Sequence, residues 1–179
     1  MGGVDKGLQV HQGAPLALHA LMRLGMQVGS VMINANRNLS AYEALEVPVW
    51  PDTTPDFAGP LAGMLTGLEH CETPWMVSVP CDSPLFPLDL VERLSATASR
   101  EGADIAMPRI VESDGQHRAQ PVFCLMSITV AESLAEFLKS GGRKIDQWTA
   151  TQRTVLVDFA EADAFRNANT FDELRGLTA

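Results

Sequence analysis

Short apolar runs of strand length alternate with helical segments along the chain, and this alternation constrains the fold more than any other feature. The first strands are expected over 28–33, 47–50 and 75–79, with helices over 14–25 and 61–70. Later strands are expected over 104–107, 121–126 and 154–157, and later helices over 88–94, 131–138, 144–150 and 171–177. Such alternation is typical of a mostly parallel sheet with helices on both faces. The sequence therefore predicts an α/β fold in which residues 1–179 form a single domain.

Charge and composition exclude several classes of protein. The formal net charge is -9, and the sequence shows no basic stripe of the kind that a nucleic-acid surface requires. No apolar run approaches the roughly 18 to 20 residues of a membrane span, and the N-terminus lacks a signal-peptide pattern. The three cysteines form no C-x-x-C pair, which favours a reducing compartment. We therefore expect a cytoplasmic protein without nucleic-acid or membrane partners.

Polar side chains follow three of the expected strands at the point where each strand ends. Asn34 and Asn36 come after the first strand, Asp52 after the second and Asp82 after the third. The carboxyl ends of parallel strands meet at one edge of a sheet, and α/β proteins bind their ligands there. The sequence therefore predicts a ligand site at this edge. An acidic chain can still bind a triphosphate when a metal ion and a few local cations hold it.

Asp82 is a candidate metal ligand. It lies between Pro80 and Pro84 at the end of a buried strand, so its position is fixed by the chain on both sides. Magnesium takes one or two protein carboxylates and completes its shell with substrate phosphates and water. Asp82 or Ser83 could instead cap the following helix. The residues alone favour neither interpretation.

The N-terminal segment is a candidate phosphate loop. Gly2 and Gly3 would let backbone N–H groups approach an anion, and Lys6 could reach phosphate oxygens. The segment is not a Walker loop, because the G-x-x-x-x-G-K-[ST] pattern is absent. Taken alone, the segment is better interpreted as a flexible N-terminus.

Two further segments could contact a ligand. Gly59 and Gly63 stand at the start of a helix, where free N–H groups can accept a phosphate or a nucleobase, although they could also mark only the helix start. Asn167 and Asn169 precede the capping box that opens the last expected helix. That capping box explains Thr170 but leaves the two asparagines without a structural role. Asp52 could similarly be only a turn residue.

Five motifs occur in one order along the chain, and together they are specific. They are Met-Gly-Gly-Val-Asp-Lys-Gly at 1–7, Val-Met-Ile-Asn-Ala-Asn-Arg at 31–37, Gly-Pro-Leu-Ala-Gly-Met at 59–64, Pro-Cys-Asp-Ser-Pro at 80–84 and Asn-Ala-Asn-Thr at 167–170. Over nearly the whole chain, this set resembles the molybdenum cofactor guanylyltransferases, the MobA family. The resemblance implies a Rossmann-like nucleotidyltransferase fold. It also implies transfer of GMP from GTP to molybdopterin with Mg²⁺, with release of pyrophosphate.

The resemblance assigns the nucleotide-binding residues by motif. Gly2 and Gly3 would belong to the phosphate loop, and Lys6 would bind the GTP phosphates. Asn34 and Asp52 would contact the nucleotide. GTP and molybdopterin are then the expected small-molecule partners, and proteins that supply molybdopterin or accept the finished cofactor are expected macromolecular ones. The protein is expected to act as a monomer.

The remaining motif residues would complete the site. Gly59 and Gly63 would flank the GTP, and Asp82 would ligate Mg²⁺ while lying near the nucleotide. Asn167 and Asn169 would lie on the metal or molybdopterin side. Of the whole set, the resemblance implies catalytic roles for Lys6 and Asp82.

The chain departs from the family pattern at its N-terminus. Family members begin with a strand and a longer Leu-Ala-Gly-Gly loop, whereas this sequence starts at the internal Met-Gly-Gly. We therefore expect the first strand of the sheet, usually a central one, to be missing here. This departure predicts that the natural protein is longer and that the chain as given folds poorly or is inactive.

Two alternatives remain open on the sequence. The first is a related nucleotidyltransferase, such as a molybdopterin cytidylyltransferase or an enzyme acting on a sugar phosphate. The Gly-Gly-x-Asp-Lys-Gly and Gly-Pro-Leu-Ala-Gly runs favour the guanine type. The second is a non-catalytic homologue that binds molybdopterin or a partner enzyme without transferring a nucleotide.

Overall fold

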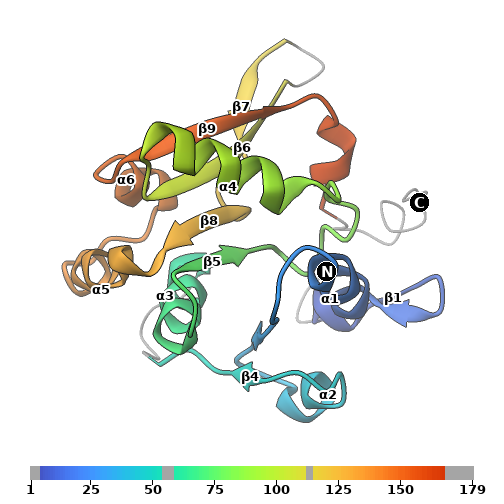
Figure 1. Ribbon diagram of the computed structural model, residues 1–179. Helices are drawn as coiled ribbons and strands as arrows, with labels where there is room; N and C mark the ends of the chain where they lie inside the picture. Colours follow the sequence, from blue (N-terminus) through green and yellow to red (C-terminus); the bar gives the residue numbers. More distant parts are fainter. Residues whose placement is uncertain (1–4, 54–58, 112–114, 168–179) are drawn as a thin grey trace.

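The computed structural model describes residues 5–53, 59–111 and 115–167, which form short strands and helices in alternation (Figure 1). The strands are β1 Val10–His11, β2 Ala14–Pro15, β3 Ile33–Asn34, β4 Val49–Trp50, β5 Trp75–Ser78, β6 Ile105–Val111, β7 His117–Ala119, β8 Cys124–Ser127 and β9 Thr154–Phe159. The α-helices are α1 Leu16–Gly25, α2 Leu39–Glu43, α3 Pro60–His70, α4 Leu90–Glu101, α5 Ala131–Lys139 and α6 Ile145–Thr149. Three 3₁₀ turns, η1 Lys6–Leu8, η2 Ile128–Val130 and η3 Ala162–Phe165, complete the described elements.

The main sheet has five strands, with β8 between β5 and β6. Strand β8 runs antiparallel to both of these neighbours, so β5 and β6 share one direction, and β9 joins β6 in parallel. Strand β7 forms an antiparallel hairpin with β6. The α/β fold expected from the sequence is confirmed. The antiparallel strand inside the sheet is a feature that the alternation of elements did not indicate.

A second, separate sheet contains only β3 and β4, which pair in parallel. Helix α3 contacts β3 of this pair and β5 of the main sheet, so it lies across the interval between the two sheets. Within the residues that the structure describes, β3 pairs only with β4 and β5 only with β8. No described strand therefore joins β3 to β5, and the two sheets stay separate. The expectation of a missing first strand stays a prediction.

Helix α4 shows how the sequence builds the core. Leu90, Leu94 and Ala98 recur every four residues, so they line one face of the helix, and all three are buried. Gly102 follows in the left-handed conformation, φ 62°, which an L side chain rarely adopts and which ends the helix. Burying a large apolar side chain fully contributes about 1.5–3 kcal/mol. The buried face of α4 therefore fixes this helix to the sheet.

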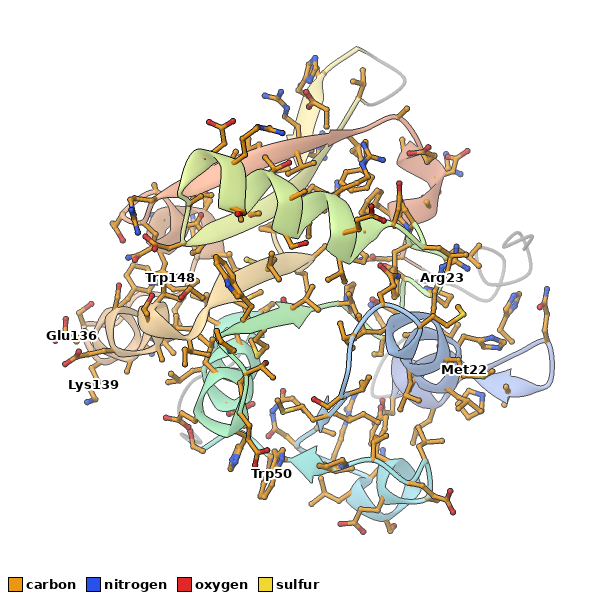
Figure 2. The ribbon with its side chains drawn as sticks, viewed as in Figure 1. Met22, Arg23, Trp50, Glu136, Lys139 and Trp148 are labelled. Carbon is orange, nitrogen blue, oxygen red and sulfur yellow. The ribbon has the colours of Figure 1, made fainter. Side chains whose placement is uncertain are left out.

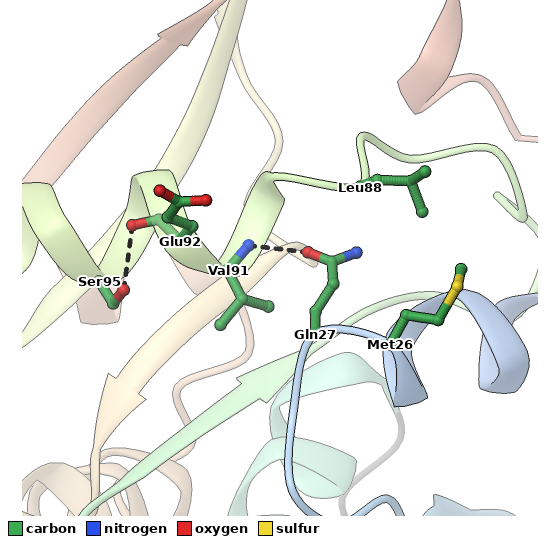
Figure 3. A pocket seen from close by; sticks show the side chains of 6 residues that line it. All are labelled: Met26, Gln27, Leu88, Val91, Glu92 and Ser95. Carbon is green, nitrogen blue, oxygen red and sulfur yellow. Dashed lines mark hydrogen bonds between the residues drawn. The ribbon is translucent and has the colours of Figure 1, made fainter.

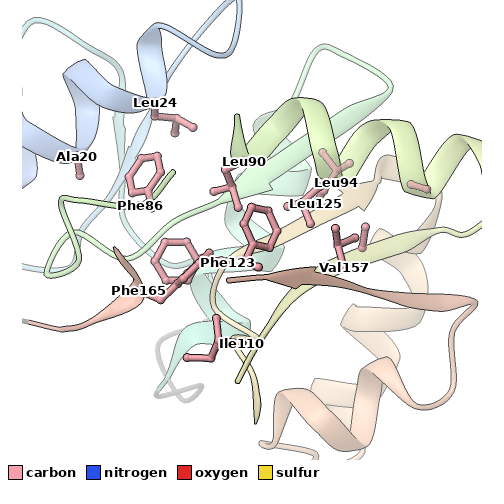
Figure 4. Close-up of a cluster of buried hydrophobic side chains, with 13 residues drawn as sticks. Ala20, Leu24, Phe86, Leu90, Leu94, Ile110, Phe123, Leu125, Val157 and Phe165 are labelled. Carbon is pink, nitrogen blue, oxygen red and sulfur yellow. The ribbon is translucent and has the colours of Figure 1, made fainter. Parts of the chain in front are cut away.

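Two hydrophobic clusters cover opposite faces of the main sheet. The first, the α4 cluster, joins α1 and α4 to one face (Figure 4); it contains Ala20, Leu24, Phe86, Leu90, Leu94, Ala98, Ala106, Ile110, Phe123, Leu125, Val157, Phe159 and Phe165. The second, the α5 cluster, joins α3, α5 and α6 to the other; it contains Leu61, Met64, Leu65, Leu68, Ile105, Met107, Cys124, Met126, Val130, Leu134, Leu138, Ile145 and Trp148. Alternate residues of β6 enter different clusters, as the pleat of a strand requires. Helices on both faces are thus confirmed.

Some sequence expectations differ from the structure in detail. Of the strand expected over 28–33, only Ile33 is in a strand, because β4 offers just two partner residues. The polar segment at 112–118, where the alternation predicts no strand, contributes His117 and Arg118 to β7. This edge strand is exposed, so no apolar alternation marks it. The helix expected at 171–177 lies outside the described residues, and the single-domain expectation stays a prediction.

No helix in the described parts of the chain combines the length and the apolar character needed to cross a membrane.

Candidate functional site

The first part of the site is a polar network at the carboxyl ends of β3 and β4. Asn34, the last residue of β3, donates from Nδ2 to the Trp50 carbonyl at 3.0 Å and to Asp52 Oδ1 at 2.9 Å. Asn36 donates to the other oxygen, Asp52 Oδ2, at 2.8 Å, and its own Oδ1 accepts from the Asp52 N–H at 2.7 Å. Parallel pairing places both strand ends together, so the two amides can hold both oxygens of one carboxylate. Asp52 is therefore fixed in orientation while Asn34 and Asn36 remain exposed.

The start of α3 lies directly against this network. A Cβ atom added at Gly63 would lie 2.4 Å from Asn34 Oδ1, which is closer than any real contact. Only glycine lets the first turn of α3 approach the amide so closely. Gly59 precedes the helix with φ 119°, again a conformation that L side chains rarely adopt, and Pro60 occupies the first turn. The two motif glycines thus set the helix start beside Asn34 and Asp52, where unpaired backbone N–H groups favour an anion.

The second part of the site is an ion pair beyond the end of β5. Lys6 Nζ lies 3.2 Å from Asp82 Oδ2, and 39% of the lysine side chain but only 13% of the aspartate side chain is exposed. The neighbouring Ser83 is fully buried and donates a hydrogen bond from Oγ to Oδ1 of Asn167. Residues from the two ends of the chain therefore meet at the loop that follows β5. This loop thus brings together Lys6 and Asp82, which the resemblance assigns to the phosphates and the metal, and Asn167, which it assigns to the metal or molybdopterin side.

A third group, around Asp5, was not anticipated as a unit. The Asp5 carboxylate accepts hydrogen bonds from Tyr42 Oη at 2.6 Å and from Asn38 Nδ2 at 2.9 Å, and Arg37 Nε lies 3.6 Å away. Burial alone would raise the pKa of Asp5, but these hydrogen bonds and the Arg37 charge outweigh it and lower the pKa. Burial, reinforced by the Asp5 carboxylate, raises the pKa of Tyr42 far above its usual value. One sequence signal could have indicated the contact: Tyr42 is the single tyrosine, and a buried tyrosine hydroxyl needs a partner.

The segment from Asn34 to Asn38 links the network around Asp52 to the group around Asp5. Its first residues belong to the Asp52 network, and its last residues contact Asp5, the neighbour of Lys6. The structure thus brings the predicted residues into two groups joined by one short stretch of chain. Gly2, Gly3 and Asn169 lie outside the described residues. Asn167 is exposed and reaches the site through Ser83.

The donor set at Asp82 suits a cation that takes most of its ligands from substrate and water. The described residues contain no group of three or more His, Cys, Asp or Glu side chains able to hold a metal ion. A structural zinc site would need such a group. Magnesium needs only one or two carboxylates together with phosphate oxygens and water, and Asp82 provides one carboxylate. The residues present therefore fit Mg²⁺ brought in with a nucleotide.

Two cavities of the described structure lie apart from both groups of predicted residues. One, of about 310 Å³, lies between the end of α1 and the start of α4 (Figure 3). Gln27 spans it and accepts a hydrogen bond from the Val91 N–H at 3.0 Å. Another, of about 210 Å³, lies beside α1, from which Met22 and Arg23 project (Figure 2), and it reaches Pro84. None of the predicted site residues lines either of these two cavities.

Comparison with known proteins identifies the family of this chain. Residues 1–155 match the model of the MobA-like NTP transferase domain family. A molybdenum cofactor guanylyltransferase of Bordetella petrii is 62% identical over 177 residues, which cover 99% of this chain and 90% of the relative. The protein of the same name from Cupriavidus necator is 59% identical, with 98% of this chain and 88% of the relative covered.

Solved structures show the same fold at low identity. The molybdopterin-guanine dinucleotide biosynthesis protein A of Archaeoglobus fulgidus has a TM-score of 0.73 and 19% identity, covering 97% of this chain and 89% of its own. The 2-C-methyl-D-erythritol 4-phosphate cytidylyltransferase of Thermus thermophilus has a TM-score of 0.75 and 16% identity, covering 95% and 90%. With a family model spanning most of its length and relatives about 60% identical over nearly all of it, this chain belongs to the molybdenum cofactor guanylyltransferases of the MobA-like NTP transferase family.

Proposed function

We propose that this chain transfers GMP from GTP to molybdopterin and releases pyrophosphate. The observation that carries the proposal is the Lys6–Asp82 pair, which holds a cation and a carboxylate together beyond the end of β5. The Asn34–Asp52 network lies at the ends of two other strands, as expected for a nucleotide that extends along the edge of the sheet. The choice of a guanine nucleotide and of the molybdenum cofactor as substrates follows from the names of the relatives.

The reaction needs little covalent chemistry from the protein. A phosphate oxygen of molybdopterin forms a bond to the α-phosphorus of GTP, and the bond from that phosphorus to the bridging oxygen of the β-phosphate breaks. The electron pair leaves with pyrophosphate. The attacking phosphate is already ionised, so no general base is required. Because both reactants are anions, neutralising charge and aligning the groups are the main tasks of the site.

Lys6 and Asp82 have complementary roles in this proposal. Asp82 would hold Mg²⁺, which when bound supplies charge stabilisation to phosphate oxygens and to the leaving group. Lys6, which pairs with Asp82 in the structure, would exchange that carboxylate for oxygens of the triphosphate. The family suggests a divalent metal, and Mg²⁺ is the ion that a single carboxylate with phosphate ligands fits.

The other motif residues would bind and orient the substrates. Asn34 and Asp52 would contact the nucleotide, supported by the start of α3 at Gly59 and Gly63. Asn167 would serve the metal or molybdopterin side, where Ser83 holds its amide. Gly2, Gly3 and Asn169 keep their expected roles as phosphate-loop and acceptor-side residues. The protein partners, the monomeric state and the cytoplasmic location stay predictions.

The proposal is tested by calorimetric titration with GTP and with CTP, each with and without Mg²⁺. The same titration is made on a version extended upstream by any in-frame Leu-Ala-Gly-Gly segment. Mg²⁺-dependent binding of GTP but not CTP by either protein supports a guanylyltransferase. Binding of CTP alone would favour the cytidylyltransferase alternative. Binding of neither nucleotide would refute the transferase assignment and favour a non-catalytic molybdopterin-binding protein.

A further inference from the structure

Tyr42, in helix α2, contacts both residues that flank Lys6. Its hydroxyl donates a hydrogen bond to Asp5 Oδ1 at 2.6 Å. A Cβ atom added at Gly7 would lie 2.4 Å from the same hydroxyl oxygen, so the backbone of Gly7 packs directly against it. Only 5% of Tyr42 is exposed, so the phenol is itself held firmly. Lys6 is therefore the middle residue of three whose outer members both rest on one buried hydroxyl group.

The turn that carries Lys6 has little means of holding its own shape. The 3₁₀ turn η1 spans three residues, and its backbone bonds are Leu8 N–H to Asp5 O at 3.3 Å and Gln9 N–H to Lys6 O at 3.0 Å. Such short turns are marginal without tertiary contacts. A lysine side chain also has about 2 kcal/mol of rotamer entropy, so it is not rigid by itself. The position of the Lys6 ammonium must depend on contacts from outside the turn.

Asp5 supplies those contacts through its carboxylate. Besides Tyr42, it binds Asn38 Nδ2 at 2.9 Å, and Arg37 Nε lies 3.6 Å away. Asn38 adopts the left-handed conformation, φ 53°, directly before α2. The carboxylate therefore ties the Lys6 turn to the segment that follows β3. The Lys6 side chain extends from this turn to Asp82, and its Nζ lies 3.2 Å from Asp82 Oδ2.

We propose that Tyr42, acting through Asp5 and Gly7, is a positioning residue that fixes the Lys6 ammonium opposite Asp82. Tyr42 does not itself touch the substrate in this arrangement. The proposal rests on the proposed function, because it takes Lys6 as the residue that neutralises the triphosphate. It also explains the glycine after Lys6, since any side chain at position 7 would displace the phenol.

A double-mutant cycle tests the proposal, made in the chain as given or, if that chain does not turn over GTP, in the version extended upstream. Tyr42→Phe removes the hydroxyl and keeps the ring, and Lys6→Ala removes the ammonium. If Tyr42 acts by positioning Lys6, Tyr42→Phe lowers kcat/KM about tenfold or more in the wild-type background, because small misplacements of catalytic groups are costly. In the Lys6→Ala background the same substitution has no further effect, since the two changes remove one function. Equal losses in both backgrounds would overturn the proposal.

A control and a second variant separate positioning from folding. Ser40→Ala changes an exposed residue of the same helix and leaves kcat/KM unchanged. Asp5→Ala is the second variant, for use if Tyr42→Phe folds poorly; it removes both carboxylate oxygens, and with them the acceptor of the Tyr42 hydroxyl, and should lower kcat/KM as Tyr42→Phe does. Full activity of a folded Asp5→Ala protein would also contradict the proposal.

Hydrogen exchange provides a readout that needs no turnover. Tyr42→Phe should speed amide exchange at Leu8 and Gln9, which close the Lys6 turn, and leave β6 unchanged. Unchanged exchange at both amides would refute the anchoring role. If the wild-type protein failed to use GTP but Tyr42→Phe still loosened the turn, the proposed function would fall while the anchor stood. The two failures are thus distinguishable.

Discussion

The main five-stranded sheet and the β3–β4 region are held together by different interactions. The sheet is covered on both faces by buried clusters, in which Trp148 is fully buried and Phe123 is 2% exposed. Strands β3 and β4 have two residues each, and their ends are held by an exposed network of amides around Asp52. Apolar burial dominates the free energy of folding, whereas exposed polar networks contribute little to it. The fold thus draws most of its stability from the apolar clusters of the main sheet, whereas its proposed chemistry lies in polar side chains at strand ends, around Asp52 and beyond β5 at Asp82.

This separation predicts two kinds of substitution. Changes in the two clusters should lower the free energy of unfolding and affect activity only through folding. Changes at the polar strand ends should lower activity or nucleotide affinity and leave unfolding nearly unchanged. The site residues are oriented by hydrogen bonds and close glycine contacts rather than by core packing.

The largest effect is expected for Asp82→Ala. The substitution removes the carboxylate proposed to hold the metal, so turnover of GTP should fall by about three orders of magnitude. The free energy of unfolding should change by about 1 kcal/mol or less, because partly exposed ion pairs contribute little. Steady-state kinetics and urea denaturation measure the two quantities. Asp89→Ala, an exposed carboxylate that pairs with Arg93 at 3.6 Å, is the control and should change neither. Near-normal turnover of Asp82→Ala would remove the metal assignment.

The opposite pattern is expected for Phe123→Ala in the α4 cluster. Phe123 is 2% exposed and packs against Phe86 and Phe165, with ring centroids 5.9 and 5.0 Å apart. Truncating a buried phenylalanine costs about 3–5 kcal/mol of unfolding free energy. Urea denaturation should show this loss, while the folded fraction keeps its affinity for GTP. Leu156→Ala on β9, where 38% of the residue is exposed, serves as the control and should cost far less. Equal losses for the two variants would contradict the assignment of stability to the clusters.

A smaller effect separates two glycines of helix α3. Gly63→Ala would place a methyl group 2.4 Å from Asn34 Oδ1, whereas Gly67→Ala would meet the Met76 sulfur at 2.6 Å. Methionine is flexible and can move aside, but Asn34 is bound to Trp50 and Asp52. Calorimetry should show GTP affinity reduced about tenfold by Gly63→Ala, the loss of roughly one charged hydrogen bond. Gly67→Ala should leave affinity unchanged. Loss of affinity in both variants would mean that α3, rather than Asn34, is what the alanine disturbs.

Much of the fold follows from patterns that the sequence displays. The spacing of Leu90, Leu94 and Ala98 predicts a helix with one buried face, and the structure buries that face. By contrast, β8 is antiparallel in the middle of the sheet, and no local pattern in 124–127 distinguishes the two directions. The exposed hairpin strand β7 was also missed, because polar edge strands carry no alternation. Local periodicity thus indicates elements, while tertiary pairing decides their direction.

The candidate site was predictable to a similar degree. Strand ends placed Asn34 beside Asp52, and the family motifs supplied the assignment of Lys6 to the same site as Asp82. The contact of Tyr42 with Asp5 spans 37 residues and depends on how α2 packs, so no motif contains both partners. A long-range hydrogen bond between two single side chains, such as this one, could not be predicted from the sequence.

The smallest effect is an acid dependence that belongs to the sheet region. Hydrogen bonds from Arg153 Nε and its terminal nitrogen to Asp104, at 2.7 and 2.6 Å, lower the pKa of that carboxyl. A group whose pKa is lower in the folded protein stabilises the fold above its unfolded pKa of about 3.9 and loses that contribution as the pH falls. The stability of Arg153→Gln should therefore fall less between about pH 5 and 3 than that of the wild type. Urea midpoints at each pH measure the difference, with Arg100→Gln, whose partner Glu101 is its exposed chain neighbour, as the control. An unchanged pH profile in Arg153→Gln would show that this pair, although well formed, contributes nothing to the stability of the sheet.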